Sequence, residues 1–382
     1  ISKMKPIEAD SLVQLHKRKS AKWRGFPADV LPLPVAEMDF PISDSIKKVL
    51  HDLVDRSDLG YLASVPELPE AFASFAKRRW NWILEPEHVH LGTDVGVVIV
   101  EILRLLGKAG DRVVITTPVY PAFAYWIKEV HMEVDERPLI EENGNWRLDF
   151  AAIEKAFVSG AKFFLMSSPH NPLGLIYKKE DLSKLAELAK AHDVIIISDE
   201  IHAPLTFTSA KFVPFLTVSD TAREVGITAT SASKSWNLAG LKCGFFYTQS
   251  EKLREALAPL AMGIHARASI TGAFGMVAAF NNSDEWLDSV IVRLEINKKL
   301  IDELVSGTSL KVSNPQNSYL SWIDFRETDL GEDPAAVILE RAKIAVNSGL
   351  AFGEPGKGFV RLNFGTSSEI LESAFSGIKS LL

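Results

Sequence analysis

The sequence has only one cysteine, no long apolar run and no excess of basic residues. Cys243 alone can form neither an intrachain disulfide nor a multi-cysteine metal site, which is typical of a reducing cytoplasm. The longest mostly apolar segment, residues 95–106, is interrupted by Glu101 and Arg104 and so does not predict a membrane span. Lys and Arg number 42 against 49 Asp and Glu, a net charge of -7 that disfavours nucleic-acid binding. We therefore expect a cytoplasmic protein with no nucleic-acid or membrane partner.

The 382 residues that are present have the composition of a folded protein, with 47% hydrophobic and 24% charged residues. Between residues 85 and 250, short apolar β-branched runs alternate with amphipathic stretches, of which residues 179–192 are the clearest. This alternation predicts βαβ units and a mostly parallel sheet. The runs that we interpret as buried strands are Arg112–Thr116, Ala161–Met166, Val194–Ser198, Gly226–Thr230 and Cys243–Tyr247.

The last third of the chain changes character. A long charged helix is predicted at residues 284–306, followed by an α+β pattern that includes a strand at residues 319–324. The change places a domain boundary near residue 280. We predict a large α/β domain at residues 46–280 and a smaller α+β domain at residues 281–382. Residues 1–45 are Pro-rich and irregular, and we expect them to pack on the small domain or on a partner chain.

Four consecutive predicted strands are each followed by a residue with useful chemistry. In open α/β sheets ligands bind beyond the carboxyl ends of the strands, so these residues should meet at one edge. Each has an ordinary structural interpretation when taken alone: a packed aromatic ring, a turn residue, a helix cap and a solvated lysine. The four residues, in strand order, are Tyr120, Asn171, Asp199 and Lys234.

Taken together, an aromatic ring, an amide, a carboxylate and a lysine amine predict a site for pyridoxal 5'-phosphate (PLP). Lys234 would form a Schiff base with the cofactor aldehyde, and Asp199 would keep the pyridine nitrogen protonated. Tyr120 would stack on the pyridine ring, while Asn171 would donate to the phenolate oxygen. His202 follows Asp199 by three residues, but no histidine or cysteine cluster accompanies it, so we expect no metal site.

The phosphate of such a cofactor needs its own binding groups. A predicted strand at residues 88–91 leads through a glycine into a helix, whose first turn would offer the backbone N–H groups of Gly96 and Val97. Ser231 and Lys242 would bind the phosphate from the opposite side. The sequence has neither a Walker A motif nor a Gly-x-Gly-x-x-Gly fingerprint, which argues against a nucleotide.

These motifs resemble those of the fold-type I PLP enzymes in the class I/II aminotransferase group, and within it the MalY/PatB-type cystathionine β-lyases. The resemblance extends from residue 22 to residue 365. Motifs shared with the whole group are Pro118-Val-Tyr120, Asn171-Pro-Leu-Gly174, Asp199 and Ser231-x-x-Lys234. Motifs shared with the lyases are Lys22-Trp23, residues 36–40, Gly60-Tyr61, Asp199-Glu-Ile-His202, residues 233–241 and residues 349–365.

The resemblance implies an aspartate-aminotransferase-like fold and the four cofactor roles given above. It adds His202 and Ser233 to the cofactor-binding residues. It also implies that Arg361 binds the substrate α-carboxylate bidentately, next to Asn171 and Tyr120. Tyr61 is similar to a tyrosine that reaches the phosphate in the neighbouring subunit, which implies a homodimer with shared active sites.

Two residues depart from the family pattern. Glu37 stands where the family usually has Asp, and Lys242 stands where close relatives often have another residue. The resemblance predicts a carbon–sulfur β-lyase that acts on L-cystathionine or related cysteine S-conjugates. Two alternatives stay open: an aminotransferase of an L-amino acid, and a PLP-binding regulatory or interaction protein.

Overall fold

A seven-stranded sheet forms the centre of the computed structural model, which describes residues 3–382. Within those residues β10 runs antiparallel to both of its neighbours, and the remaining pairs are parallel. The mostly parallel sheet predicted from the sequence is therefore confirmed. In spatial order its strands are β2 (His90–Gly92), β10 (Gly244–Tyr247), β9 (Gly226–Thr230), β8 (Ile195–Asp199), β7 (Phe163–Ser167), β3 (Arg112–Ile115) and β4 (Glu133–Glu136).

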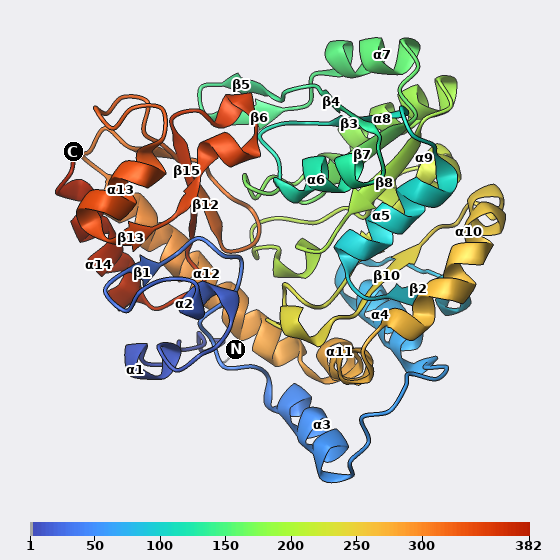
Figure 1. Cartoon of the computed structure of the whole chain (residues 1–382), viewed down its shortest axis with the longest axis horizontal. Helices are drawn as coiled ribbons and strands as arrows, with labels where there is room; N and C mark the ends of the chain where they lie inside the picture. Colours follow the sequence, from blue (N-terminus) through green and yellow to red (C-terminus); the bar gives the residue numbers. More distant parts are fainter. Residues whose placement is uncertain (1–2) are drawn as a thin grey trace.

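The central strands are mostly apolar because helices cover both faces of the sheet (Figure 1). Successive residues of a strand point to opposite faces, so Ile196 and Ile197 of β8 join two different hydrophobic clusters. The helices of this part of the chain are α3 (Asp44–Asp55), α4 (Glu67–Trp80), α5 (Val95–Leu106), α6 (Ala122–Glu129), α7 (Phe150–Val158), α8 (Lys179–Ala191), α9 (Asp220–Val225), α10 (Glu251–Ile264) and α11 (Ile270–Asn282).

The C-terminal elements form a second, smaller sheet with three helices, shown in orange and red in Figure 1. All strand pairs of this four-stranded sheet are antiparallel. Its strands, in spatial order, are β11 (Lys311–Val312), β12 (Leu320–Asp324), β15 (Phe359–Asn363) and β14 (Asn347–Ser348). The helices are α12 (Asp284–Val305), α13 (Pro334–Ala342) and α14 (Ser368–Lys379). This is the α+β arrangement that the sequence predicts for the C-terminal third.

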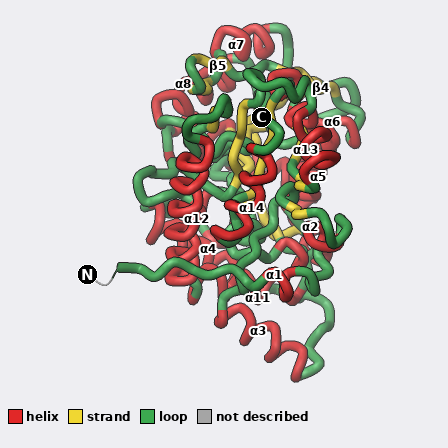
Figure 2. Tube along the Cα trace, turned by 90° about the vertical axis from the view of Figure 1, so that its left-hand side faces the viewer, coloured by secondary structure: helices red, strands yellow, loops and turns green. Residues whose placement is uncertain are grey.

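The N-terminal segment lies against these C-terminal elements, below α14 in Figure 2. It contains α1 (Leu12–Leu15), α2 (Ala21–Arg24) and β1 (Leu31–Pro32), and β1 pairs in parallel with β13 (Ile344–Ala345). After this segment α3 projects from the body of the molecule in both views. The domain boundaries given above stay predictions.

Short elements complete the described chain. A hairpin is formed by β5 (Ile140–Glu142) and β6 (Asn145–Arg147). The 3-10 helices are η1 (Pro86–His88), η2 (Ala203–Leu205), η3 (Phe215–Thr217), η4 (Ala239–Leu241), η5 (His265–Arg267), η6 (Gly349–Phe352) and η7 (Glu354–Gly356). Over residues 3–382, no helix combines the length and apolarity that a membrane crossing requires.

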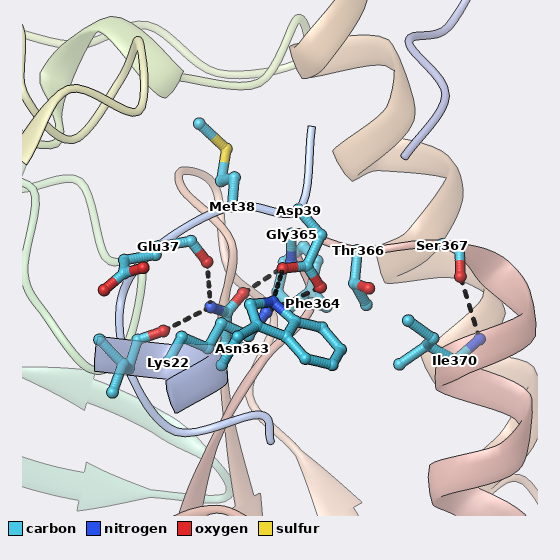
Figure 3. A network of polar contacts seen from close by, with 12 residues as sticks. Lys22, Glu37, Met38, Asp39, Asn363, Phe364, Gly365, Thr366, Ser367 and Ile370 are labelled. Atoms are coloured by element: carbon cyan, nitrogen blue, oxygen red, sulfur yellow. Dashed lines mark hydrogen bonds and ion pairs between the residues drawn. The ribbon is translucent and has the colours of Figure 1, made fainter. Parts of the chain in front are cut away.

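A buried ion pair fixes the N-terminal segment. Lys22 Nζ lies 2.9 Å from Asp39 Oδ2, and both side chains are almost fully excluded from solvent. The other carboxylate oxygen of Asp39 accepts a hydrogen bond from Trp23 Nε1 at 2.8 Å. Burial lowers the pKa of Lys22, while Asp39 opposes that shift. Figure 3 shows this pair beside the loop that follows β15, where the backbone N–H of Asp39 donates to Gly365 O at 2.8 Å.

Replacing Asp39 by Ala is expected to destabilise the protein by about 3–5 kcal/mol, because it leaves the Lys22 charge and the Trp23 N–H without their buried partner. Asp52→Ala is the matched control, since Asp52 forms an exposed pair with Lys48 at 2.8 Å. Urea unfolding of both variants measures the difference. Equal, small losses of unfolding free energy would show that the buried pair does not stabilise the N-terminal segment.

Candidate active site

A cavity of about 440 Å³ lies at the carboxyl edge of the large sheet and contains several of the predicted residues. The volume is within the usual range for a small-molecule site. Its walls come from the start of α5, the segment from Tyr120 through α6, the end of β8 and the loop between β9 and β10. The predicted site residues that line it are Gly96, Val97, Tyr120, Asp199, Ser233, Lys234 and Lys242.

Lys234 follows β9 and is half-buried, with its amine in this cavity. Its Nζ donates to the backbone carbonyl of Ala36, 3.3 Å away, so the N-terminal segment reaches the site. Burial lowers the pKa of Lys234 to about 8, and the nearby positive charge of Arg361 adds to the shift. The amine is therefore more readily deprotonated than an ordinary lysine, as a nucleophile or base must be.

The pH dependence of apoprotein stability tests this lowered pKa. Between pH 8 and 10.5 the unfolded chain holds a proton on Lys234 that the folded chain has released, so stability should rise with pH in that window. We expect the apo Lys234→Met variant to be more stable than the wild-type apoprotein at pH 7, and the gap to close towards pH 10.5. A gap in melting temperature that does not change with pH would contradict the shift.

Asp199 is the last residue of β8 and is 7% exposed. Its Oδ1 accepts from the Ile201 N–H at 3.2 Å, whereas Oδ2 has no hydrogen-bond partner in residues 3–382. Burial raises the pKa of Asp199 to about 7, although the charge of Lys234 opposes the shift. A buried carboxylate with a free oxygen favours a ligand that brings a positive charge or a donor.

Tyr120 and Asn171 come from neighbouring loops that are joined by their backbones. The Tyr120 N–H donates to Asn171 O at 3.2 Å. The ring of Tyr120 is held edge-on by Trp126 at 5.8 Å between centroids, and Trp126 also lines the cavity. Behind them His170 Nε2 lies 2.6 Å from Pro118 O, which ties the two loops together. The loops that carry Tyr120 and Asn171 therefore lie side by side at this edge of the sheet.

Arg361 lies in the middle of β15 and connects the small sheet to this site through its contact with Asn171. Its Nη1 donates to Asn171 Oδ1 at 3.0 Å, and its Nη2 donates to Asn347 Oδ1 at 2.9 Å. Nη2 also donates to Pro34 O at 3.1 Å. The guanidinium is buried, which lowers the pKa of Arg361 to about 10 and leaves it cationic at neutral pH. Its hydrogen-bond partners in the described chain are all neutral groups, so it suits an anionic ligand.

At the other end of the cavity lies the start of α5. Asp94 caps this helix by accepting from the Val97 N–H at 2.8 Å, and the preceding N–H of Gly96 has no partner in the described chain. A Cβ on Gly96 would lie 2.8 Å from the Trp126 ring, so glycine is needed for the close approach. Lys242 Nζ lies 3.4 Å from Asp94 Oδ2 across the cavity mouth. This end therefore combines backbone donors with a lysine, as a phosphate requires.

Five predicted residues are not among those that line the cavity: Asn171 and Arg361, described above, and Ser231, His202 and Tyr61. The Ser231 hydroxyl donates to Cys243 O at 2.7 Å and accepts from the Ser233 N–H at 3.1 Å. His202 Nδ1 lies 2.9 Å from Ser318 Oγ, and burial lowers the pKa of His202 to about 3, so the ring is neutral. Tyr61 is 98% exposed in the loop between α3 and α4. Residues 3–382 contain no group of three or more His, Cys, Asp or Glu placed to hold a metal ion.

Sequence reasoning missed the backbone carbonyl of Ala36 and the side chain of Asn347. It also missed Tyr319, whose hydroxyl donates to Ala36 O at 3.0 Å. Ala36 belongs to the motif at residues 36–40, but that motif does not single out a backbone carbonyl, and neither Asn347 nor Tyr319 belongs to a motif named above. Their contacts join segments that are far apart in the sequence, for which periodicity gives no signal.

Comparisons with known proteins place this chain in a family. The family "Aminotransferase class I and II" matches residues 28–378, and this chain belongs to it. A cystathionine beta-lyase of Corynebacterium glutamicum is 35% identical over 97% of this chain and 99% of its own length. The resemblance to the class I/II group and to its cystathionine β-lyases is therefore confirmed.

Solved structures agree on the fold. A provisionally assigned PLP-dependent β-cystathionase of Corynebacterium diphtheriae superposes with a TM-score of 0.92 at 33% identity, covering 98% of both chains. Cystalysin of Treponema denticola, which contains pyridoxal 5'-phosphate, gives a TM-score of 0.91 at 25% identity, covering 100% of this chain and 98% of its own. The fold-type I architecture predicted from the sequence is confirmed.

The residues of the cavity fit the cofactor of this family. Asp199 offers a buried carboxylate with an unpaired oxygen, and Lys234 offers an amine with a lowered pKa. The helix α5 and Lys242 offer donors for a phosphate at the opposite end. The site therefore has a group for the pyridine nitrogen, one for the aldehyde and a set for the phosphate.

Proposed function

We propose that this protein is a PLP-dependent carbon–sulfur β-lyase that cleaves L-cystathionine or related cysteine S-conjugates to pyruvate, ammonia and a thiol. The observation that carries the proposal is the meeting of Lys234, Asp199 and Arg361 at one edge of the sheet. The names of the relatives at 29–36% identity over nearly the whole chain support the same reaction.

Each residue has a distinct part in the proposed reaction. Bound PLP supplies an electron sink that makes the proton on the substrate Cα acidic. Arg361 binds the α-carboxylate with its guanidinium fork and so fixes the orientation of Cα. Lys234 Nζ accepts the Cα proton, while Asp199 holds the proton on the pyridine nitrogen. Asn171, hydrogen-bonded to Arg361, links the substrate carboxylate site to the cofactor site.

The bond changes balance without an added oxidant. The electron pair of the Cα–H bond forms a Cα–Cβ double bond, and the Cβ–S pair leaves with sulfur. Lys234 can return the proton to the thiolate. Water then hydrolyses the unsaturated amine to pyruvate and ammonia. The aminotransferase alternative uses the same residues up to the loss of the Cα proton.

The spectrum of the bound cofactor separates these two reactions. The holoenzyme is mixed with L-cystathionine in the absence of a 2-oxo acid. A lyase regenerates the aldehyde form of the cofactor after each turnover, so we expect its visible absorption to persist while substrate is consumed. Complete conversion to the amine form after one turnover would refute the lyase and support an aminotransferase.

We also propose a homodimer in which Tyr61 reaches the phosphate of the neighbouring subunit. The side chains of Tyr61 and Leu59 are 98% and 57% exposed. Both lie in the loop that follows α3, the helix that projects from the body of the molecule. Large apolar side chains exposed on a projecting segment suit an interface. Sedimentation should give twice the mass of one chain.

A cytoplasmic location is likewise a proposal, supported by the single buried Cys243.

A further inference from the structure

A second cavity, of about 770 Å³, adjoins the active site. Ala239 and Lys242 line both cavities, so the two lie next to each other at η4 and the residue after it. The walls of the second cavity come from the N-terminal segment, the start of α3 and the loop after Lys234. Its charged lining residues are Asp10, Arg18, Lys19, Glu37, Lys47 and Lys242.

Residues 35–38, which we call the strap, run past Lys234, and Glu37 of the strap lines this cavity. The carbonyl of Ala36 accepts from Lys234 Nζ, and the carbonyl of Glu37 accepts from Asn363 Nδ2 at 2.6 Å. Asn237 clamps the far end, since its side chain exchanges hydrogen bonds of 2.9 and 2.8 Å with the N–H and carbonyl of Met38. These contacts therefore hold the backbone of Glu37 in place. Glu37 directly follows Ala36, whose carbonyl is the group that Lys234 contacts.

The carboxylate of Glu37 has no hydrogen-bond or ion-pair partner in residues 3–382, although the residue is half-buried. The contrast is with Asp39, two residues later, whose carboxylate is fully paired with Lys22 and Trp23. In Figure 3 the side chain of Glu37 points away from the pair that Asp39 forms with Lys22. A half-buried carboxylate beside the reacting lysine, with no cation of its own, suits a ligand that brings an ammonium group.

Positive charge lines the open side of the same cavity. Lys19 and Lys47 are exposed, and neither forms an ion pair with another residue of the described chain. Arg18 is different, because its guanidinium already donates to Asp10 and to the carbonyls of Met38 and Phe40. The cavity thus offers one unpaired carboxylate near Lys234 and two unpaired ammonium groups at its rim.

We propose that this second cavity binds the distal amino-acid end of a zwitterionic leaving group, with Glu37 holding its ammonium and Lys19 and Lys47 attracting its carboxylate. The inference rests on the proposed lyase function. Arg361 then binds one end of the substrate and Glu37 the other, with the sulfur between them. Of the cysteine S-conjugates, those that resemble L-cystathionine satisfy all of these charges, and those with a short uncharged tail leave Glu37 unpaired.

The test compares kcat/KM of the holoenzyme for L-cystathionine and for S-methyl-L-cysteine, whose tail carries no charge. Glu37→Gln should lower the ratio of the two values about tenfold, through a higher KM for cystathionine, because a charge-assisted hydrogen bond is lost. Glu37→Asp keeps the carboxylate and should restore most of the ratio. Visible absorption of the cofactor and circular dichroism confirm that each variant is loaded and folded.

Neighbouring lysines provide a matched control. Lys47→Gln should lower the ratio by about twofold to threefold, since an exposed charge contributes little. Lys48→Gln, one residue further along α3 and outside the cavity, should leave it unchanged. Equal losses on both substrates for Glu37→Gln, or no change in the ratio, would overturn the second-cavity assignment. No pyruvate from either substrate with the wild-type enzyme would instead refute the proposed lyase function.

Discussion

The Lys234→Ala variant is expected to lose its turnover of cysteine S-conjugates by a factor of about 10⁴ or more. Lys234 is asked to bind the cofactor and to move the Cα proton, and a positioned base alone contributes about 10²–10⁴. The neighbouring Lys242 cannot take over, because its Nζ lies by Asp94 at the phosphate end of the cavity. The absorption band of the lysine-linked cofactor should disappear with the activity.

The fold should survive this change. Lys234 is half-buried, and its one hydrogen bond goes to Ala36 O at 3.3 Å, so its loss leaves no buried pair broken. Circular dichroism and the melting temperature of the variant serve as the control. A persistent band together with normal turnover would show that another lysine binds the cofactor.

The second large effect is expected at Arg361. Replacing it by Ala should raise KM for amino-acid substrates about 100-fold, since truncating one partner of a buried charged contact costs about 2–5 kcal/mol. Arg361→Lys keeps the charge but loses the bidentate fork, and should recover only part of the loss. Cofactor affinity should change far less than KM, because the guanidinium reaches the cofactor site only through Asn171.

Steady-state kinetics and a cofactor titration measure the two quantities separately. Equal losses of substrate and cofactor affinity would show that Arg361 is a structural residue. A structural role is a real alternative, because Arg361 also donates hydrogen bonds to Asn347 and to the carbonyl of Pro34. In the proposed role these contacts orient the guanidinium for the carboxylate.

The sheet could be predicted because burial on both faces leaves a strong signal in the sequence. The strand β8 is predicted at residues 194–198 and observed at 195–199, and α8 is predicted at 179–192 and observed at 179–191. The direction of β10 could not be predicted, since a strand buried on both faces has the same composition in either orientation. The helix α11 gave no clear pattern, because it is apolar on most sides where α3 and α4 pack on it.

The candidate active site also has features that could be predicted from the sequence and others that could not. Tyr120, Asp199 and Lys234 could be placed together because the carboxyl ends of adjacent strands must meet at one edge. The contact of Lys234 with Ala36 could not be predicted, since it joins residues 198 positions apart through a backbone carbonyl. The Ser231 hydroxyl, which we expected to bind phosphate, donates to Cys243 O, a loop contact that leaves no trace in a motif.

The most direct test of the proposed β-elimination is the product balance from L-cystathionine. The purified, PLP-loaded protein is incubated with L-cystathionine and no 2-oxo acid, and pyruvate and homocysteine are quantified over many turnovers. The proposed mechanism predicts equal amounts of the two, both in large excess over enzyme. Homocysteine and pyruvate that fail to exceed the enzyme concentration would contradict it, and the site around Lys234 would then have to be assigned another reaction.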